Sequence, residues 1–250
     1  MNFKDYFSEQ ADIYAQSRPR YPDDLFEYLV SLSPSKELAW DVGTGNGQAA
    51  ISLAKYFDRV IATDGSKEQI NNAFTNQKIE YKVATAENSG LESNSVDLIT
   101  VATAIHWFNH DKFYPEAKRI LKNGGIIAAW CYAFSKTNDS IDTIIHHFAT
   151  ETLKDYWPPE RRFVWNNYAD LPFPFEIIET PKFYCRVNWN LNQMVNYLNS
   201  WSSVQKYIAA HNSNPIEIIL PELMKAWGEP DAIKETSWEL GLKIGKVNTH

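Results

Sequence analysis

Three glycines follow a short apolar run near residue 40, and this arrangement constrains the fold more than any other feature of the chain. Residues Leu38–Val42 predict a buried strand, Gly43–Gly47 a turn, and Gln48–Tyr56 a helix by its periodicity. Glycines at a strand-to-helix turn allow the backbone to approach a ligand closely, and the helix N-terminus offers unpaired N–H groups. The segment therefore predicts an α/β unit with a ligand at its turn.

Strand and helix patterns alternate along the next part of the chain. Apolar runs predict strands at residues 59–63, 80–83, 95–101 and 126–132, and helical patterns lie at residues 67–74 and 111–121. Ser66 is a suitable N-cap for the first of these helices, and Asn123–Gly125 a suitable stop for the second. This alternation predicts an α/β fold, a Rossmann-like doubly wound sheet of mostly parallel strands with helices on both faces.

The second half of the chain is rich in aromatic residues and has a less regular pattern. We expect a helix at residues 140–153, an irregular stretch at 157–175, a strand at 176–187, a helix at 191–208 and a final strand at 236–247. No repeat or clear linker separates these segments. We therefore predict a single domain over residues 1–250, with a cofactor-binding core at 36–132 and cap and substrate-pocket elements at 1–35 and about 133–235.

Charge and composition exclude several classes of partner. The net charge is −7 and no block of five like charges occurs, so the basic stripe typical of nucleic-acid enzymes is missing. The chain begins without a signal-like apolar run, and no window approaches the roughly 18 apolar residues of a membrane span. Two cysteines in apolar runs are typical of reduced core thiols. We expect a cytoplasmic protein with no membrane or nucleic-acid partner and no evident obligate protein partner.

The glycine spacing separates two candidate ligands. A dinucleotide fingerprint requires G-x-G-x-x-G/A, and counting from Gly43 its last position is Gln48. The chain has instead D-x-G-x-G-x-G, with Asp41 inside the strand. Asp64 closes the next expected strand, where a carboxylate accepts hydrogen bonds from both ribose hydroxyls, a device that NAD enzymes also use. An NAD(P)-dependent oxidoreductase is therefore an alternative, although no Tyr-x-x-x-Lys pair is found.

Several blocks, in order, resemble the class I S-adenosylmethionine-dependent methyltransferases over about residues 36–132. The blocks are Trp40–Gly47, Ala62–Asp64, Ala86-Glu87 with Ser95–Ile99, and Phe113, Glu116-Ala117 and Arg119–Gly125. The resemblance implies a seven-stranded sheet whose last strand is antiparallel, S-adenosylmethionine as cofactor and S-adenosylhomocysteine as product. It also implies methyl transfer to an acceptor by in-line displacement. A methyltransferase fold that binds the cofactor without catalysis is the second alternative.

A second, narrower resemblance includes segments on both sides of this core. Phe7, Ala11, Tyr14 and Arg18–Pro22 resemble the N-terminal cap of methyltransferases related to trans-aconitate methyltransferase. Ala104–Phe108 resembles the His-Trp pair of that group, and Asn199–Ser203 its Trp-Ser segment. This resemblance implies a small-molecule acceptor, with a carboxylate as the first candidate.

The resemblance also implies the cofactor-binding residues. They are Tyr14, Arg18, Asp41, Gly43, Thr44, Gly45, Gly47, Asp64, Gly65, Ala86, Glu87 and Ala102. The glycine turn packs against the methionine part, Asp41 positions the turn or contacts the ammonium group, and Asp64 binds the ribose. Arg18 pairs with the cofactor carboxylate, unless it is a solvated surface charge. Thr85 stands where related proteins often carry an acidic residue, so we expect backbone around Ala86 to hold the adenine.

The acceptor site is expected to contain His106, Trp107, Arg161 and Trp165. His106 follows the fourth strand, where open α/β sheets place their ligands, and its chemistry suits a general base. A hydrogen bond to the substrate or a structural role are its alternatives, and a stacked surface arginine is the alternative for Arg161. His146 and His147 are adjacent and so point to different faces of a helix. No cluster with zinc spacing is found, so we expect no metal.

Overall fold

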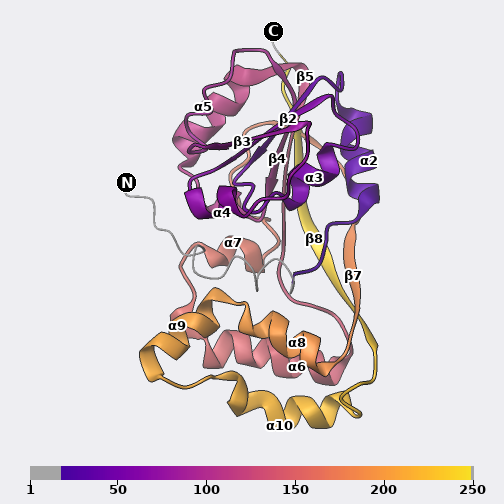
Figure 1. Ribbon diagram of the computed structural model, residues 1–250, viewed down its shortest axis with the longest axis vertical. Helices are drawn as coiled ribbons and strands as arrows, with labels where there is room; N and C mark the ends of the chain where they lie inside the picture. The colour runs from indigo at the N-terminus through magenta and orange to yellow at the C-terminus, as the bar shows by residue number, and fades with distance from the viewer. Residues whose placement is uncertain (1–17, 249–250) are drawn as a thin grey trace.

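A mixed β-sheet forms the centre of the computed structural model, which describes residues 18–248 (Figure 1). Its parallel part has the order β3-β2-β1-β4-β5, with every neighbouring pair parallel. The bounds are β1 Leu38–Val42, β2 Arg59–Asp64, β3 Ile79–Val83, β4 Val96–Ala102 and β5 Leu121–Tyr132. Because all five run the same way, β1, β2 and β4 present their carboxyl ends at one edge of the sheet. The predicted mostly parallel α/β sheet is confirmed.

The antiparallel part is built around one long strand, β8 (Lys234–Lys246), which pairs with β5. Its other edge pairs with β6 (Glu176–Ile178) near the C-terminal end and with β7 (Tyr184–Trp189) near its start. The predicted strand over 176–187 is therefore wrong as a single element. The sheet has eight strands among the described residues, one more than expected. Strands β6 and β7 therefore belong to the sheet, although their residues were predicted to be part of the cap.

Helices cover both faces of the sheet, as predicted. On one face α2 (Asp23–Leu32) and α3 (Gln48–Leu53) bury Phe26 and Leu53 against strand residues such as Trp130. On the other face α5 (His110–Ile120) buries Phe113. Residues 96–101 of β4 are all buried, as expected for a strand covered on both sides.

The predicted stop signal of α5 differs from the structure. Helix α5 ends at Ile120 and β5 begins at once, so Asn123–Gly125 lies within the strand and is no C-cap. The reason is pairing with the C-terminal segment, since Gly124 donates its N–H to the carbonyl of Val247. In contrast, Ser66 caps α4 (Lys67–Asn71) as predicted, by accepting from the N–H of Gln69.

A layer of helices lies beyond one end of the sheet (Figure 1). It consists of α6 (Asp139–His147), α8 (Leu191–Asn199), α9 (Ser202–His211) and α10 (Ile216–Trp227). Helix α7 (Arg161–Trp165) lies between this layer and the sheet, inside the stretch predicted to be irregular. The single helix predicted at 191–208 is wrong, because the extended backbone at Trp201 separates α8 from α9. Within residues 18–248 no helix has the length and apolar character to cross a membrane.

Candidate functional site

The turn after β1 is held open by its glycines. Gly43, Gly45 and Gly47 all have positive φ angles, +66°, +56° and +88°, which side-chain-bearing residues rarely adopt. A Cβ at Gly43 would lie 2.6 Å from the Cβ of Ala104, so the Gly43 backbone packs directly against the Ala104 side chain. A Cβ at Gly45 would meet only the Oε1 of Gln69, at 3.8 Å, so the space beside Gly45 is open. The turn is therefore a cradle that a side chain at residue 45 would fill.

Asp41 braces this turn from inside the sheet. Its carboxylate is fully buried and accepts from the hydroxyl of Thr44 at 2.5 Å and from that of Thr100 at 2.6 Å. Burial raises the pKa of Asp41 to about 6, although the hydrogen bonds from Thr100 and Thr44 oppose the shift. Because its side chain has no exposed surface, the geometry supports the positioning role for Asp41 over direct contact with an ammonium group.

Asp64 lies at the carboxyl end of β2, beside the turn. One oxygen accepts from the N–H of Gly45 at 2.9 Å and the other from the N–H of Ser66 at 2.8 Å. Each carboxylate oxygen has a second acceptor site, so the group remains able to accept hydroxyl hydrogens. The structure thus brings Asp64 and the glycine turn together, as the sequence predicted. The open cradle and this carboxylate fit an adenosyl ligand with a ribose.

The residues expected around the adenine lie at the ends of neighbouring strands. Ala86 is buried shortly after β3, and Gly65 follows Asp64 directly. Glu87 is used within the fold, because it accepts from the N–H of Asn109, the residue that precedes α5. This bond connects Glu87 to the start of α5, and its predicted cofactor contact stays a prediction.

The segment after β4 connects the glycine turn to the expected acceptor residues. Ala102 ends β4 beside Trp130 of β5, and the following turn brings Ala104 against Gly43. Residues 105–107 then form a short 3₁₀ helix that carries His106 and Trp107, whose rings lie 4.9 Å apart. The predicted site residues on β1 and after β4 are therefore neighbours in space.

His106 is buried, with 5% of its surface exposed. Its Nδ1 lies 2.9 Å from the hydroxyl of Tyr168, a residue that the sequence reasoning missed. Burial lowers the pKa of His106 to about 3, and the positive charge of Arg161 contributes to the shift. The imidazole is therefore neutral throughout the physiological pH range.

Arg161 lies at the start of α7, with its guanidinium 4.8 Å above the ring of Trp157. No carboxylate of residues 18–248 lies within salt-bridge distance of it, and its Nε is buried without a hydrogen-bond partner. Burial lowers the pKa of Arg161, and the nearby charge of Arg18 adds to this effect. A half-buried guanidinium that packs on an aromatic ring, with no carboxylate near it and its Nε without an acceptor among the described residues, favours an anionic ligand.

Aromatic rings surround Arg161 on the cap side. The ring of Trp157 lies 6.1 Å from that of Trp165 and 5.5 Å from that of Trp201, and Trp165 stacks on Phe134. The indole N–H groups of Trp165 and Trp201 are buried and have no hydrogen-bond acceptor among the described residues. The Nε of Arg161 and these two indole N–H groups are thus three donors without an acceptor near the ring of Trp157. They suit a ligand rich in acceptor oxygens.

Arg18 connects the N-terminal side to the cap. Its guanidinium donates to the carbonyl of Ser200 at 3.3 Å and lies 5.3 Å from the centre of the Tyr197 ring. These contacts place it near the break between α8 and α9, and its predicted pairing with a cofactor carboxylate stays a prediction. Tyr14 lies outside the described residues.

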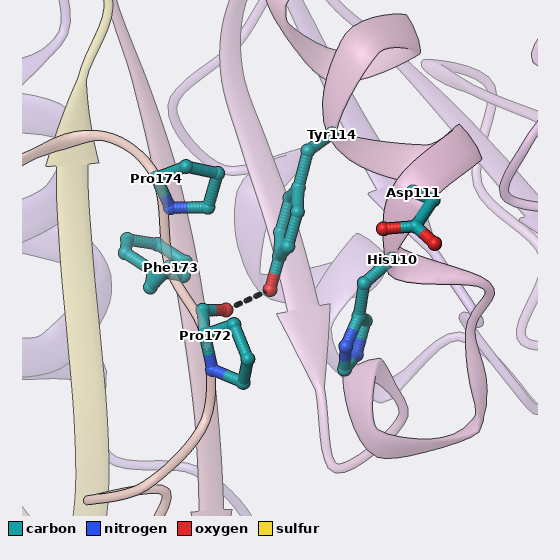
Figure 2. A pocket seen from close by; sticks show the side chains of 6 residues that line it. All are labelled: His110, Asp111, Tyr114, Pro172, Phe173 and Pro174. Carbon is teal, nitrogen blue, oxygen red and sulfur yellow. Dashed lines mark hydrogen bonds between the residues drawn. The ribbon is translucent and has the colours of Figure 1, made fainter.

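A surface pocket of about 550 Å³ is lined by other residues (Figure 2). It is lined by residues of α5 and by residues 172–174, and the hydroxyl of Tyr114 donates to the carbonyl of Pro172 beside it. None of the predicted site residues lines this pocket. Elsewhere in the described chain, no group of three or more His, Cys, Asp or Glu side chains is arranged to hold a metal ion.

Replacement of Asp64 tests the cofactor side of the site. We expect Asp64→Ala to raise the dissociation constant for S-adenosylhomocysteine by at least about tenfold, because the ribose hydroxyls lose their acceptor. Isothermal titration calorimetry measures this. Asp142→Ala is the matched control, since Asp142 also accepts from a backbone N–H, that of Thr137, but in the cap. Unchanged affinity in Asp64→Ala would remove Asp64 from the ribose site.

The chain is similar to known methyltransferases over most of its length. A family model described as a methyltransferase domain matches residues 40–129. A protein of Dictyostelium discoideum named as a methyltransferase is 38% identical over 92% of this chain and 89% of its own length. CRG1 of Saccharomyces cerevisiae, named as an S-adenosylmethionine-dependent methyltransferase, is 25% identical over 84% of this chain and 85% of its own length.

A solved structure extends the similarity to the cap. The structure of a type II methyltransferase from Anaeromyxobacter dehalogenans matches with a TM-score of 0.87 and 35% sequence identity. The match covers 93% of this chain and 99% of that one. The similarity in fold therefore includes the helical layer beyond the end of the sheet.

Proposed function

This chain belongs to the class I S-adenosylmethionine-dependent methyltransferases, and from that membership we propose that it methylates a small molecule at a carboxylate. The observation that carries the proposal is the half-buried guanidinium of Arg161, which has a buried Nε without an acceptor and no carboxylate partner among residues 18–248. We also propose that the chain is related to trans-aconitate methyltransferase, on the resemblance of residues 18–22, 104–108 and 199–203. We propose further that it is a single domain divided into a core and a cap.

The cofactor is assigned to the edge where β1, β2 and β4 end. In this proposal the turn at Gly43–Gly47 packs against the methionine part, and Asp64 accepts from the ribose hydroxyls. Thr44 and Gly45 fix the turn through their bonds to Asp41 and Asp64. S-adenosylmethionine supplies an electrophilic methyl group on a sulfonium whose leaving thioether is neutral. No residue of the chain therefore has to protonate a leaving group.

The acceptor is assigned to a position beside Arg161, Trp165, Trp107 and His106. Arg161 offers a planar fork of donors that matches a carboxylate, and the indole of Trp165 offers one more donor. A carboxylate is already ionised at neutral pH. One of its oxygens forms the bond to the methyl carbon as the carbon–sulfur bond breaks, and no proton changes place. The product is a neutral methyl ester, which Arg161 holds less strongly than the acid.

His106 is assigned as a hydrogen-bonding residue and not as the general base. A base with a pKa of about 3 is too weak to take a proton from a phenol or an ammonium group near neutral pH. An acceptor that arrives ionised removes the need for one. The weak basicity of His106 therefore supports a carboxylate acceptor over a phenol or an ammonium group.

A paired panel of acceptors tests the proposal. We expect the full chain to release S-adenosylhomocysteine with several carboxylic acids and with none of the primary amides of the same carbon skeletons. Mass spectrometry should find the acid increased by one methyl group, in a form that mild base hydrolyses. Turnover of phenols or amines without turnover of acids would contradict the proposal. Binding of S-adenosylhomocysteine with no turnover of any acceptor would favour a binding module instead.

A further inference from the structure

We propose that Tyr168 is a positioning residue that holds His106 as the Nε2–H tautomer, so that His106 donates a hydrogen bond into the acceptor site. The inference rests on the proposed function only for the identity of the group that receives this bond. The tautomer and its cause are properties of the protein alone. Three observations support the inference: the left-handed backbone at residues 167–168, the packing of this turn on β8, and the hydrogen bond between Tyr168 and His106.

The backbone at Tyr168 is strained. Asn167 and Tyr168 both have left-handed φ angles, +53° and +62°, directly after α7. Asparagine tolerates this region, but for a bulky aromatic residue it costs roughly 1–2 kcal/mol. Such strain persists only where the surrounding structure imposes it, and it is concentrated at functional sites.

Packing against β8 imposes this conformation. Gly241 of β8 lies so close to the turn that a Cβ there would come within 2.6 Å of the Cα and the carbonyl oxygen of Asn167. The Tyr168 N–H donates to the carbonyl of Phe163 at 2.7 Å, which closes the turn onto α7. Tyr168 is thus fully buried, with its hydroxyl directed at His106. A glycine in the sheet and a strained turn together fix the position of one hydroxyl group.

The direction of the hydrogen bond follows from what each atom can do. Burial raises the pKa of Tyr168 well above its usual value, so its hydroxyl keeps its proton. Nδ1 of His106 is its one hydrogen-bond partner among the described residues. If Nδ1–H donated instead, the buried hydroxyl proton would lack an acceptor, at a cost of roughly 1–3 kcal/mol. The hydroxyl therefore donates to Nδ1, and the proton of the neutral imidazole is on Nε2.

An Nε2–H group suits the charge of the proposed acceptor. Nε2 has no hydrogen-bond partner among the described residues. Burial keeps His106 neutral by lowering its pKa, and the ionisable groups that act on it, Arg161 and His110, lower the pKa further. A donor beside that guanidinium is matched by a carboxylate oxygen and opposed by an ammonium group. His106 would then orient the oxygen that Arg161 does not hold.

Nitrogen NMR of the protein labelled with ¹⁵N-histidine tests the tautomer without any acceptor. The chain has six histidines, and His106→Gln identifies the signals of His106 by their loss. We expect Nε2 to appear protonated and Nδ1 unprotonated and hydrogen-bonded. In Tyr168→Phe the Nδ1 signal should move toward that of a nitrogen without a hydrogen bond. A protonated Nδ1 in the unmodified chain, or an unchanged Nδ1 signal in Tyr168→Phe, would overturn the proposal.

Kinetics with an acid found in the acceptor panel give a second test. We expect Tyr168→Phe to lower kcat/KM about tenfold with unchanged affinity for S-adenosylhomocysteine. In the His106→Gln background the same substitution should change kcat/KM less than about twofold, because glutamine lacks the Nδ1 acceptor. Equal losses in both backgrounds would show that Tyr168 acts independently of His106, contrary to the proposal.

Tyr114→Phe is the matched control for both experiments. It removes another enclosed tyrosine hydroxyl, which donates to Pro172 at the pocket of Figure 2. It should leave the His106 signals and kcat/KM unchanged. If the NMR result holds and no acid is methylated, the proposed function fails while the role of Tyr168 stands.

Discussion

Gly45→Val should weaken the binding of S-adenosylmethionine and S-adenosylhomocysteine at least about 100-fold, equivalent to about 2.7 kcal/mol. Gly45 has a φ angle of +56°, and the space beside it is open apart from the Oε1 of Gln69 at 3.8 Å. A valine side chain would occupy this space, where the backbone is expected to meet the cofactor. Its N–H, which now donates to Asp64, would shift as well. Calorimetric titration of the folded variant measures the loss.

The effect of backbone strain on cofactor affinity has to be separated from the effect of a side chain that blocks the site. Gly228→Val provides the control, because Gly228 has a φ angle of +83°, open space around it and a position at the end of α10. Both variants should lose thermal stability, and only Gly45→Val should lose cofactor affinity. Full affinity in a folded Gly45→Val protein would mean that the turn does not contact the cofactor.

Arg161→Met should lower kcat/KM for an acid acceptor about 100-fold, because the carboxylate loses a charged hydrogen-bonding partner. Methionine keeps the length of the side chain over Trp157. Affinity for S-adenosylhomocysteine should not change. Removing an enclosed charge that has no carboxylate partner should leave the melting temperature equal or higher, which distinguishes a functional group from a structural one.

The neighbouring arginine gives a closely matched control. Arg162 also stacks on an aromatic ring, that of Phe163 at 4.8 Å, but its side chain is exposed. Arg162→Met should retain the full kcat/KM, and Arg161→Lys should fall between Arg161→Met and the unmodified chain. An Arg161→Met protein that is destabilised and still methylates acids normally would contradict the assignment.

The cofactor side of the site could be predicted from the sequence because its determinants are local. Buried parallel strands are continuous apolar runs, and their ends carry the glycines and acidic residues that are needed there. The observed bounds of β1, β2 and β3 agree with the predicted ones to within one residue. The turn, Asp41 and Asp64 lie close together for the same reason, since neighbouring parallel strands end at one edge.

The acceptor side depends on packing between distant segments. His106 and Tyr168 are 62 positions apart, and their contact depends on a turn that Gly241 accommodates. Nothing in the periodicity of residues 157–175 indicates that turn. The sequence predicted Arg161 in the acceptor site, but not that its guanidinium would lack a carboxylate partner among residues 18–248. Likewise, the break between α8 and α9 comes from extended backbone at Trp201 and not from a glycine or proline.

The complete burial of Asp41 and the partial burial of Arg161 lower the stability of the fold at these sites. The pKa of Asp41 is about 6 in the folded chain, above its value of 3.8 when unfolded. The folded state therefore binds more protons between these values, and its stability falls as the pH rises through that window. Arg161 carries a similar penalty of burial. Such penalties are typical of binding sites, where function and not stability selects the residue.

Calorimetric titration of the full chain with S-adenosylhomocysteine, and in parallel with NADH, tests most directly whether the turn after β1 and Asp64 hold an adenosyl-methionine ligand. We predict saturable one-to-one binding of S-adenosylhomocysteine, displaced by S-adenosylmethionine, and no heat from NADH. A folded protein that binds neither sulfur ligand, or that binds NADH instead, would contradict the account.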